Sequence, residues 1–198
     1  MLSGRRLDLL DPSPLDVEIE DIAQGLSRVA RWNGQTSGPH PLSVAEHSLI
    51  VEYIRGRMRP APTAEERLAA LLHDAPEYVI GDMISPFKAA LGIDYRAFEA
   101  RLARAVHLRF GLPASLPEAW EARIKKADRL SAWFEATQLA GFSPSEAARF
   151  FPRPRAVWAA DLVIEPAAAD LVRARFVERF QALSAMMAGA AGTRGGGR

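Results

Sequence analysis

The chain has 198 residues, 25 basic and 24 acidic side chains, a formal net charge of +1 and no cysteine. This length fits one domain, and the near-neutral charge argues against a nucleic-acid polymer or an anionic membrane as partner. Without cysteine the chain can form neither disulfides nor thiolate metal sites, so any metal ion must be held by histidine and carboxylate side chains.

Residues 1–15 are predicted to be an N-terminal extension. They carry several charges and two prolines. They contain neither the apolar core of a signal peptide nor the roughly 18–20 apolar residues that span a bilayer. We therefore expect a soluble, cytoplasmic protein that does not insert into a membrane.

The first half of the chain shows helical periodicity and no convincing strand series. A helix is predicted over residues 16–31, with an apolar face of Ile19, Ile22, Ala23, Leu26, Val29 and Ala30. Residues 33–42 form a loop rich in Gly and Pro. Ser43 and Glu46 have the spacing of a capping box that opens the next helix. The inner stripe of that helix consists of Val44, His47, Ile50, Val51, Ile54 and Met58.

The second half continues in the same way after a break at "RPAPT", residues 59–63. Helices are predicted from about Ala64 to near Pro76, over a short segment after Ser85-Pro86, from Asp94 to Gly111, from Pro117 to Gly141, after the cap "SPSE", and from Glu165-Pro166 to about Met187. The Gly-rich tail, residues 188–198, is expected to be disordered. The prediction is an all-α, single-domain bundle over residues 16–187.

Polar residues lie on three of the predicted apolar faces. They are His47, the pair His73-Asp74, and Asp128. Taken singly, each has an ordinary explanation as a hydrogen-bonded core histidine or a surface ion pair. Burying all four without compensation would cost several kcal/mol per ion, and one divalent cation would satisfy them together. The resulting set of two nitrogens and two oxygens suits a transition metal, with Mn, Fe, Co, Ni and Zn all admissible.

These residues, with their neighbours, resemble a known family. The motifs are "RW" at 31–32, "SVAEHSL" at 43–49, "HDAPEYVIGD" at 73–82, "SPFK" at 85–88 and "ADRL" at 127–130. They resemble the HD-domain metal-dependent phosphohydrolases, and most closely the bacterial 5′-deoxynucleotidases. The resemblance covers about half of the chain. It implies an HD-type helical bundle with a buried metal ion, a small-molecule nucleotide as substrate, and a homodimer.

The resemblance also implies roles for single residues. Glu77 and the metal ligand Asp74 would be catalytic, Asp82 would contact the sugar hydroxyl, Arg31 would bind the phosphate and Trp32 would pack on sugar or base. Lys88, near a predicted helix start, is a further phosphate-binding candidate. From the residues alone, plainer roles stay open, such as a solvated Glu77, a turn carboxylate at Asp82, a core tryptophan or a surface lysine. Lys125 and Lys126 are expected mainly at the surface, and His107 outside the site.

The predicted activity is hydrolysis of the 5′-phosphate of deoxyribonucleoside monophosphates, assisted by the metal ion. Two alternatives remain open at this stage. One is a deoxynucleoside triphosphate triphosphohydrolase, and the other is a non-catalytic nucleotide-binding HD module. Hydrolysis of guanosine polyphosphates is disfavoured, because enzymes of that kind carry consecutive acids after the HD pair whereas Tyr78 follows Glu77 here.

Overall fold

The structure, a computed structural model, describes the backbone of residues 1–83 and 93–195. Within these ranges it is helical and contains no strand, only an isolated bridge between Ala30 and Ser43. The elements are η1 (Pro14–Asp16), α1 (Ile19–Leu26), η2 (Arg31–Gly34), α2 (Val44–Arg57), α3 (Ala64–Leu71), α4 (Glu77–Ile80), α6 (Ile93–Arg109), α7 (Glu118–Gln138), α8 (Pro144–Phe150), η3 (Val157–Asp161) and α9 (Ala169–Gly195). The all-α prediction is confirmed for the described chain. The predicted helix at Ser85-Pro86 and the candidate Lys88 lie outside the described residues.

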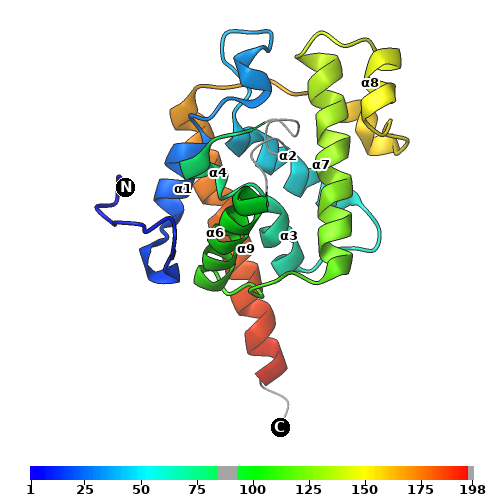
Figure 1. The fold of residues 1–198 in the computed structure, drawn as a ribbon. Helices are drawn as coiled ribbons and strands as arrows, with labels where there is room; N and C mark the ends of the chain where they lie inside the picture. Colours follow the sequence, from blue (N-terminus) through cyan, green and yellow to red (C-terminus); the bar gives the residue numbers. More distant parts are fainter. Residues whose placement is uncertain (84–92, 196–198) are drawn as a thin grey trace.

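Helix α2 lies in the middle of the bundle and packs against α1, α3, α7 and α9 (Figure 1). The long helix α7 runs along one side, with α8 beside one of its ends. Because α2 and α7 pack closely, side chains on their facing surfaces meet inside the protein. The predicted polar residues of α2 and α7 lie on these surfaces.

The predicted apolar faces form the core. Fully or nearly fully buried residues from six helices include Ile22, Leu26, Val51, Ile54, Leu68, Leu102, Val106, Ile124, Phe134 and Phe176. The capping box of Ser43 and Glu46 is present, with the Ser43 side chain accepting from the Glu46 backbone N–H. Periodicity and cap chemistry therefore identified the correct helix faces and the start of α2.

The first helix is shorter than predicted, since α1 ends at Leu26 rather than at residue 31. The chain then runs alongside the start of α2: the Arg31 N–H donates to the Leu42 carbonyl at 2.8 Å, and the Val44 N–H donates to the Val29 carbonyl at 2.9 Å. Non-local pairing with the segment before α2 replaces the last predicted helical turn. Arg31 and Trp32 consequently lie in η2 and not at a helix end.

The helix predicted from Ala64 to near Pro76 ends earlier, at Leu71. The chain continues through tight turns in which the Ala75 N–H donates to Leu72 O and the Glu77 N–H donates to Asp74 O, both at 3.0 Å. Proline disfavours helical geometry in the residue before it, so Pro76 explains why α3 does not continue into α4. His73 and Asp74 are therefore presented by a turn, not by a helix face.

The last helix is longer than predicted. It was expected to end near Met187, but α9 continues to Gly195, so the segment predicted to be disordered has helical backbone up to that residue. Its C-terminal part projects beyond the body of the bundle (Figure 1). No helix within the described ranges has the length and apolar character needed to cross a membrane.

Two buried ion-pair groups connect α2 to its neighbours. Glu52 accepts from Arg67 at 2.5 Å and from Arg179 at 2.8 and 3.0 Å. Arg55, which is fully buried, donates to Glu66 at 2.8 Å. A buried charge requires such partners. The ion pairs therefore account for the burial of Glu52 and Arg55 without any bound ligand. By contrast, the buried Nε2 atoms of His47 and His73 have no hydrogen-bond partner within the described residues.

Candidate metal centre and the adjoining cavities

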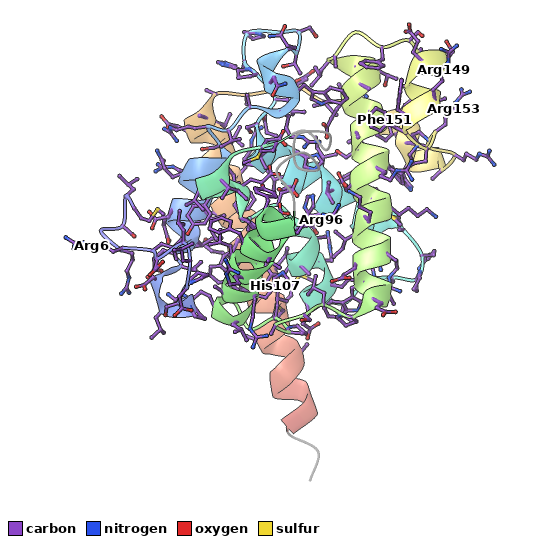
Figure 2. All side chains as sticks on the ribbon, viewed as in Figure 1. Arg6, Arg96, His107, Arg149, Phe151 and Arg153 are labelled. Atoms are coloured by element: carbon purple, nitrogen blue, oxygen red, sulfur yellow. The ribbon has the colours of Figure 1, made fainter. Side chains whose placement is uncertain are left out.

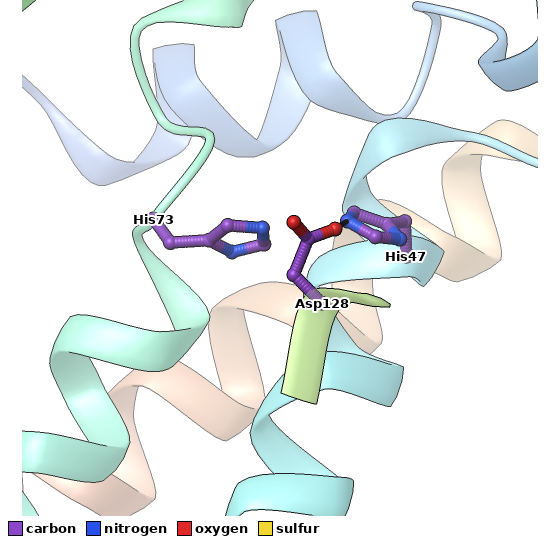
Figure 3. Close-up of side chains that lie close together, drawn as sticks. All are labelled: His47, His73 and Asp128. Atoms are coloured by element: carbon purple, nitrogen blue, oxygen red, sulfur yellow. Dashed lines mark ion pairs between the residues drawn. The ribbon is translucent and has the colours of Figure 1, made fainter. Parts of the chain in front are cut away.

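Three predicted ligands converge between α2, α7 and the turn after α3. Figure 3 shows the side chains of His47, His73 and Asp128 close together. One ligand atom of each lies within 4.8 Å of the other two. The fourth, Asp74, places Oδ2 at 3.4 Å from His47 Nε2 and at 3.2 Å from His73 Nε2. The Asp128 Oδ1 atom lies 3.5 Å from His47 Nε2. The four side chains predicted to share an ion are thus brought together.

These spacings fit a shared cation. Two ligand atoms that each lie about 2.1 Å from one tetrahedral ion are separated by about 3.4 Å. The three nitrogen–oxygen distances range from 3.2 to 3.5 Å. The Nε2 atoms of His47 and His73 are both buried and make no hydrogen bond within the described chain. Buried polar atoms nearly always have a partner, so both lone pairs are suited to a metal ion.

The other nitrogen of each ring fixes which nitrogen is free to coordinate. His73 Nδ1 lies 2.9 Å from the Ala70 carbonyl, and His47 Nδ1 lies 2.5 Å from the Glu135 carboxylate. Both partners are acceptors, so Nδ1–H is the donor and Nε2 keeps the lone pair of the neutral imidazole. A histidine that donates its second N–H to a carboxylate or carbonyl in this way is typical of metal sites.

Glu135 was not predicted from the sequence, although it makes four contacts at the centre of the site. It is completely buried. One carboxylate oxygen accepts from His47 and from Ser131, the latter at 2.7 Å, and the other accepts from Trp32 Nε1 at 2.9 Å and Arg31 Nη2 at 3.3 Å. A single carboxylate therefore orients a candidate metal ligand and two substrate-binding candidates.

We expect Glu135→Gln to weaken metal binding about 10- to 100-fold, as the loss of a partner to a metal-bound histidine typically does. The neutral amide oxygen of glutamine accepts a weaker hydrogen bond from His47 than the charged carboxylate of glutamate does. Competition titration of the metal-free protein with a chromophoric chelator measures the effect. Glu165→Gln is the matched control, because Glu165 is exposed. Equal affinities in the two variants would contradict the role of Glu135 in orienting His47.

The electrostatics of the cluster favour positive charge at its centre. Burial and the Arg31 charge oppose protonation of His47, yet Glu135, Asp128 and Asp74 raise the pKa of its imidazole well above the ordinary value, so a metal ion at Nε2 would take the place of a proton there. Burial would raise the pKa of the Asp128 carboxyl, but His47 and His73 hold it well below its usual range. The same histidines lower the pKa of Asp74 against the effect of burial. The carboxylates are therefore ionised and available to a cation.

Trp32 is fixed by an unusual backbone conformation, and Arg31 by two ion pairs. Trp32 has φ 54°, a left-handed conformation that is rare for a bulky residue. Two carboxylates hold the Arg31 guanidinium, Asp82 at 3.5 Å and Glu135 at 3.3 Å. Although burial opposes its charge, these acids raise the pKa of Arg31 above its ordinary value. The predicted trio of Arg31, Trp32 and Asp82 thus lies together beside the metal ligands.

Glu77 begins α4 and is 3% exposed. Its position depends on close packing of α1 against α4: a Cβ atom added at Gly25 would lie 2.7 Å from the Tyr78 carbonyl oxygen. Only glycine permits this approach without a shift of the backbone. The turn after Asp74 and the contact at Gly25 together place Glu77 in the wall of a cavity that the metal cluster also lines.

Two cavities adjoin the cluster and share Asp74, Lys125 and Asp128 in their walls. The first cavity, of about 370 Å³, is lined by further residues that include Arg31, Glu77, Arg129, Phe150 and Phe151. The second cavity, of about 530 Å³, is lined by His73, His107 and mainly apolar residues such as Leu116 and Ile124. Both volumes fall in the roughly 300–1,000 Å³ range of small-molecule sites.

Comparison with known proteins identifies a homologue of the chain. No family model matches the chain. An uncharacterized protein of Rhodobacter capsulatus is 57% identical over 189 residues, which cover 96% of each chain. The chain belongs to the family of this Rhodobacter protein.

The structure confirms the expected exposure of Lys125, corrects the expected placement of His107 and adds Glu135 to the candidate site. Lys125 was expected mainly at the surface, and its side chain is 72% exposed, yet its Nζ donates to Asp128 Oδ2 at 2.7 Å. His107 was placed outside the site, but it is 8% exposed and lines the second cavity from α6, where Figure 2 labels it. Glu135 could have been found from its spacing, because it follows Ser131 by four residues and Asp128 by seven on one helix face.

Proposed function

We propose that the chain is a metal-dependent phosphohydrolase that removes the 5′-phosphate from deoxyribonucleoside monophosphates. The observation that carries the proposal is the pair of buried Nε2 atoms of His47 and His73. These atoms lack hydrogen-bond partners in the described chain and lie near the carboxylates of Asp74 and Asp128. The adjoining first cavity is lined by basic side chains and by Glu77. A structural metal alone would not need this cavity.

The first cavity offers positive charge for one phosphate group. Its described lining holds three basic side chains, Arg31, Lys125 and Arg129, beside the candidate ligands Asp74 and Asp128. A phosphate monoester carries roughly −1.5 to −2 at pH 7, which these groups and a divalent cation would balance. Because Asp82 and Glu135 already pair with Arg31, little positive charge is left for the additional phosphates of a triphosphate.

A bound divalent ion would act as a Lewis acid on a phosphoryl oxygen and would acidify water. The protein supplies the remaining groups. Arg31, held between Asp82 and Glu135, is positioned to bind phosphate oxygens, and Lys125 and Arg129 add positive charge where negative charge develops. Glu77 lines the same cavity and can take the proton of the attacking water. Trp32 and Asp82 are the candidates for contact with the sugar.

A substrate panel tests this proposal. The metal-free protein is loaded separately with Mn²⁺, Co²⁺, Ni²⁺ or Zn²⁺ and incubated with deoxyribonucleoside monophosphates, ribonucleoside monophosphates and deoxyribonucleoside triphosphates. The proposal predicts orthophosphate release from the deoxyribonucleoside monophosphates at the highest kcat/KM. Release of tripolyphosphate would identify a triphosphohydrolase instead. Binding of nucleotides without release of any phosphate would identify a non-catalytic module.

A further inference from the structure

One wall of the first cavity is aromatic and lies in a part of the chain to which the resemblance does not extend. Phe150, at the end of α8, is 62% exposed. It is the one aromatic residue among the exposed large hydrophobic side chains of the described ranges. Phe150 and Phe151 line the first cavity together with Asp74 and Asp128. The ring of Phe150 is therefore accessible to a molecule bound in this cavity.

Phe150 belongs to a cluster of four aromatic rings, the aromatic shelf, formed by Trp32, Phe142, Phe150 and Phe151. Within it, Trp32 lies 5.9 Å from Phe142 and 6.0 Å from Phe151 between ring centroids. Phe150 lies 6.3 Å from both phenylalanines. In Figure 2, Phe151 lies toward α7, whereas Arg149 and Arg153 lie on the outer side of α8. The shelf thus joins the left-handed Trp32 segment to α8.

The position of the shelf is fixed relative to the metal cluster. Helix α8 begins with Pro144 and a complete capping box between Ser143 and Glu146. At its other end, Arg129 Nη2 donates to the Phe150 carbonyl at 3.3 Å. Arg129 follows the ligand Asp128 directly in α7 and also lines the first cavity. The aromatic rings are therefore held at a set distance from the site where a phosphate would bind.

We infer that the aromatic shelf binds the nucleobase of the substrate by stacking on Phe150, while the phosphate lies at the metal cluster. The inference rests on the proposed nucleotide substrate and assigns it a base-binding surface. A nucleobase offers a flat face that stacks on an aromatic side chain regardless of its hydrogen-bonding edge. The cavity joins an aromatic wall to a cationic wall, which matches the two ends of a nucleotide.

The test compares substrates with and without a base. Phe150→Ala is expected to raise KM for deoxyadenosine monophosphate about tenfold, the effect of losing one base–aromatic stack. The change in KM for 2-deoxyribose 5-phosphate, which lacks a base, is expected to stay below twofold. Phe150→Trp should restore KM for the nucleotide. Leu108→Ala is the matched control, since Leu108 is exposed and lies outside the first cavity. Equal effects of Phe150→Ala on both substrates would overturn the inference and leave the proposed function standing.

A second readout does not require turnover. Trp32 belongs to the shelf, so titration with deoxyadenosine should quench tryptophan fluorescence in the wild-type protein and about tenfold more weakly in Phe150→Ala. Quenching without any hydrolysis of monophosphates would retain the base-binding surface while removing the proposed function. Unchanged quenching in Phe150→Ala, or a fall in its molar mass by light scattering that shows Phe150 to be a subunit contact, would overturn the inference.

Discussion

Replacement of Glu77 by glutamine is expected to lower kcat about 10²- to 10⁴-fold, the usual contribution of a positioned general acid–base. Glu77 is 3% exposed and lines the first cavity, and its glutamine counterpart has nearly the same shape but cannot accept a proton. Metal content and thermal stability should remain close to wild type, because Glu77 is not among the groups brought together as ligands. Steady-state kinetics with elemental analysis of the same sample measures both.

The control for Glu77→Gln is Glu118→Gln, because Glu118 is exposed in the first turn of α7. It should behave as wild type in kcat and KM. If Glu77→Gln kept full turnover, Glu77 would have no part in proton transfer. If it lost the metal ion together with activity, Glu77 would act on metal binding and not on the chemical step.

Replacement of Asp128 by asparagine is expected to remove metal-dependent stabilisation. A ligand at 100 times its Kd stabilises the folded state by about 2.7 kcal/mol, which for a domain of this size is about 5–10 °C in Tm. The metal-free wild-type protein should show this rise on addition of metal, whereas Asp128→Asn should show less than about 2 °C. Differential scanning fluorimetry with and without each divalent ion measures the difference.

Two comparisons keep the Asp128 result interpretable. A metal-free Asp128→Asn protein that melts cooperatively shows that the variant is folded. Asp11→Asn, which changes an exposed acid, should keep the full metal-induced rise. An undiminished rise in Asp128→Asn would mean that the stabilising ion binds elsewhere.

The sequence was sufficient for the helix faces and for the four candidate metal ligands, His47, His73, Asp74 and Asp128. Apolar periodicity placed Ile22, Val51 and Phe134 correctly in the core, and cap chemistry placed the start of α2. His47 and Asp128 were found because each interrupts an apolar stripe with an ionisable group. Such interruptions are local in sequence, so they can be detected without knowing how the helices pack.

The features that were missed depend on contacts between distant segments. Arg31 leaves the helical path because residues 29–31 pair with the segment that precedes α2. The importance of Glu135 follows from His47 in α2 and Trp32 in η2, which lie 88 and 103 residues away along the chain. The place of Phe150 in the wall of the first cavity depends on how other segments pack around that cavity. Helix propensity and residue spacing describe only local sequence, so they cannot predict contacts between segments that are distant along the chain.

Anomalous diffraction from crystals equilibrated with Co²⁺ or Mn²⁺ tests the account most directly. A single strong peak is predicted about 2.0–2.2 Å from Nε2 of both His47 and His73 and from one oxygen each of Asp74 and Asp128. The same experiment on Asp128→Asn crystals should show a weak peak or none. A wild-type map without a peak between these four side chains, at metal concentrations that saturate the protein in solution, would contradict the metal centre on which the proposed activity depends.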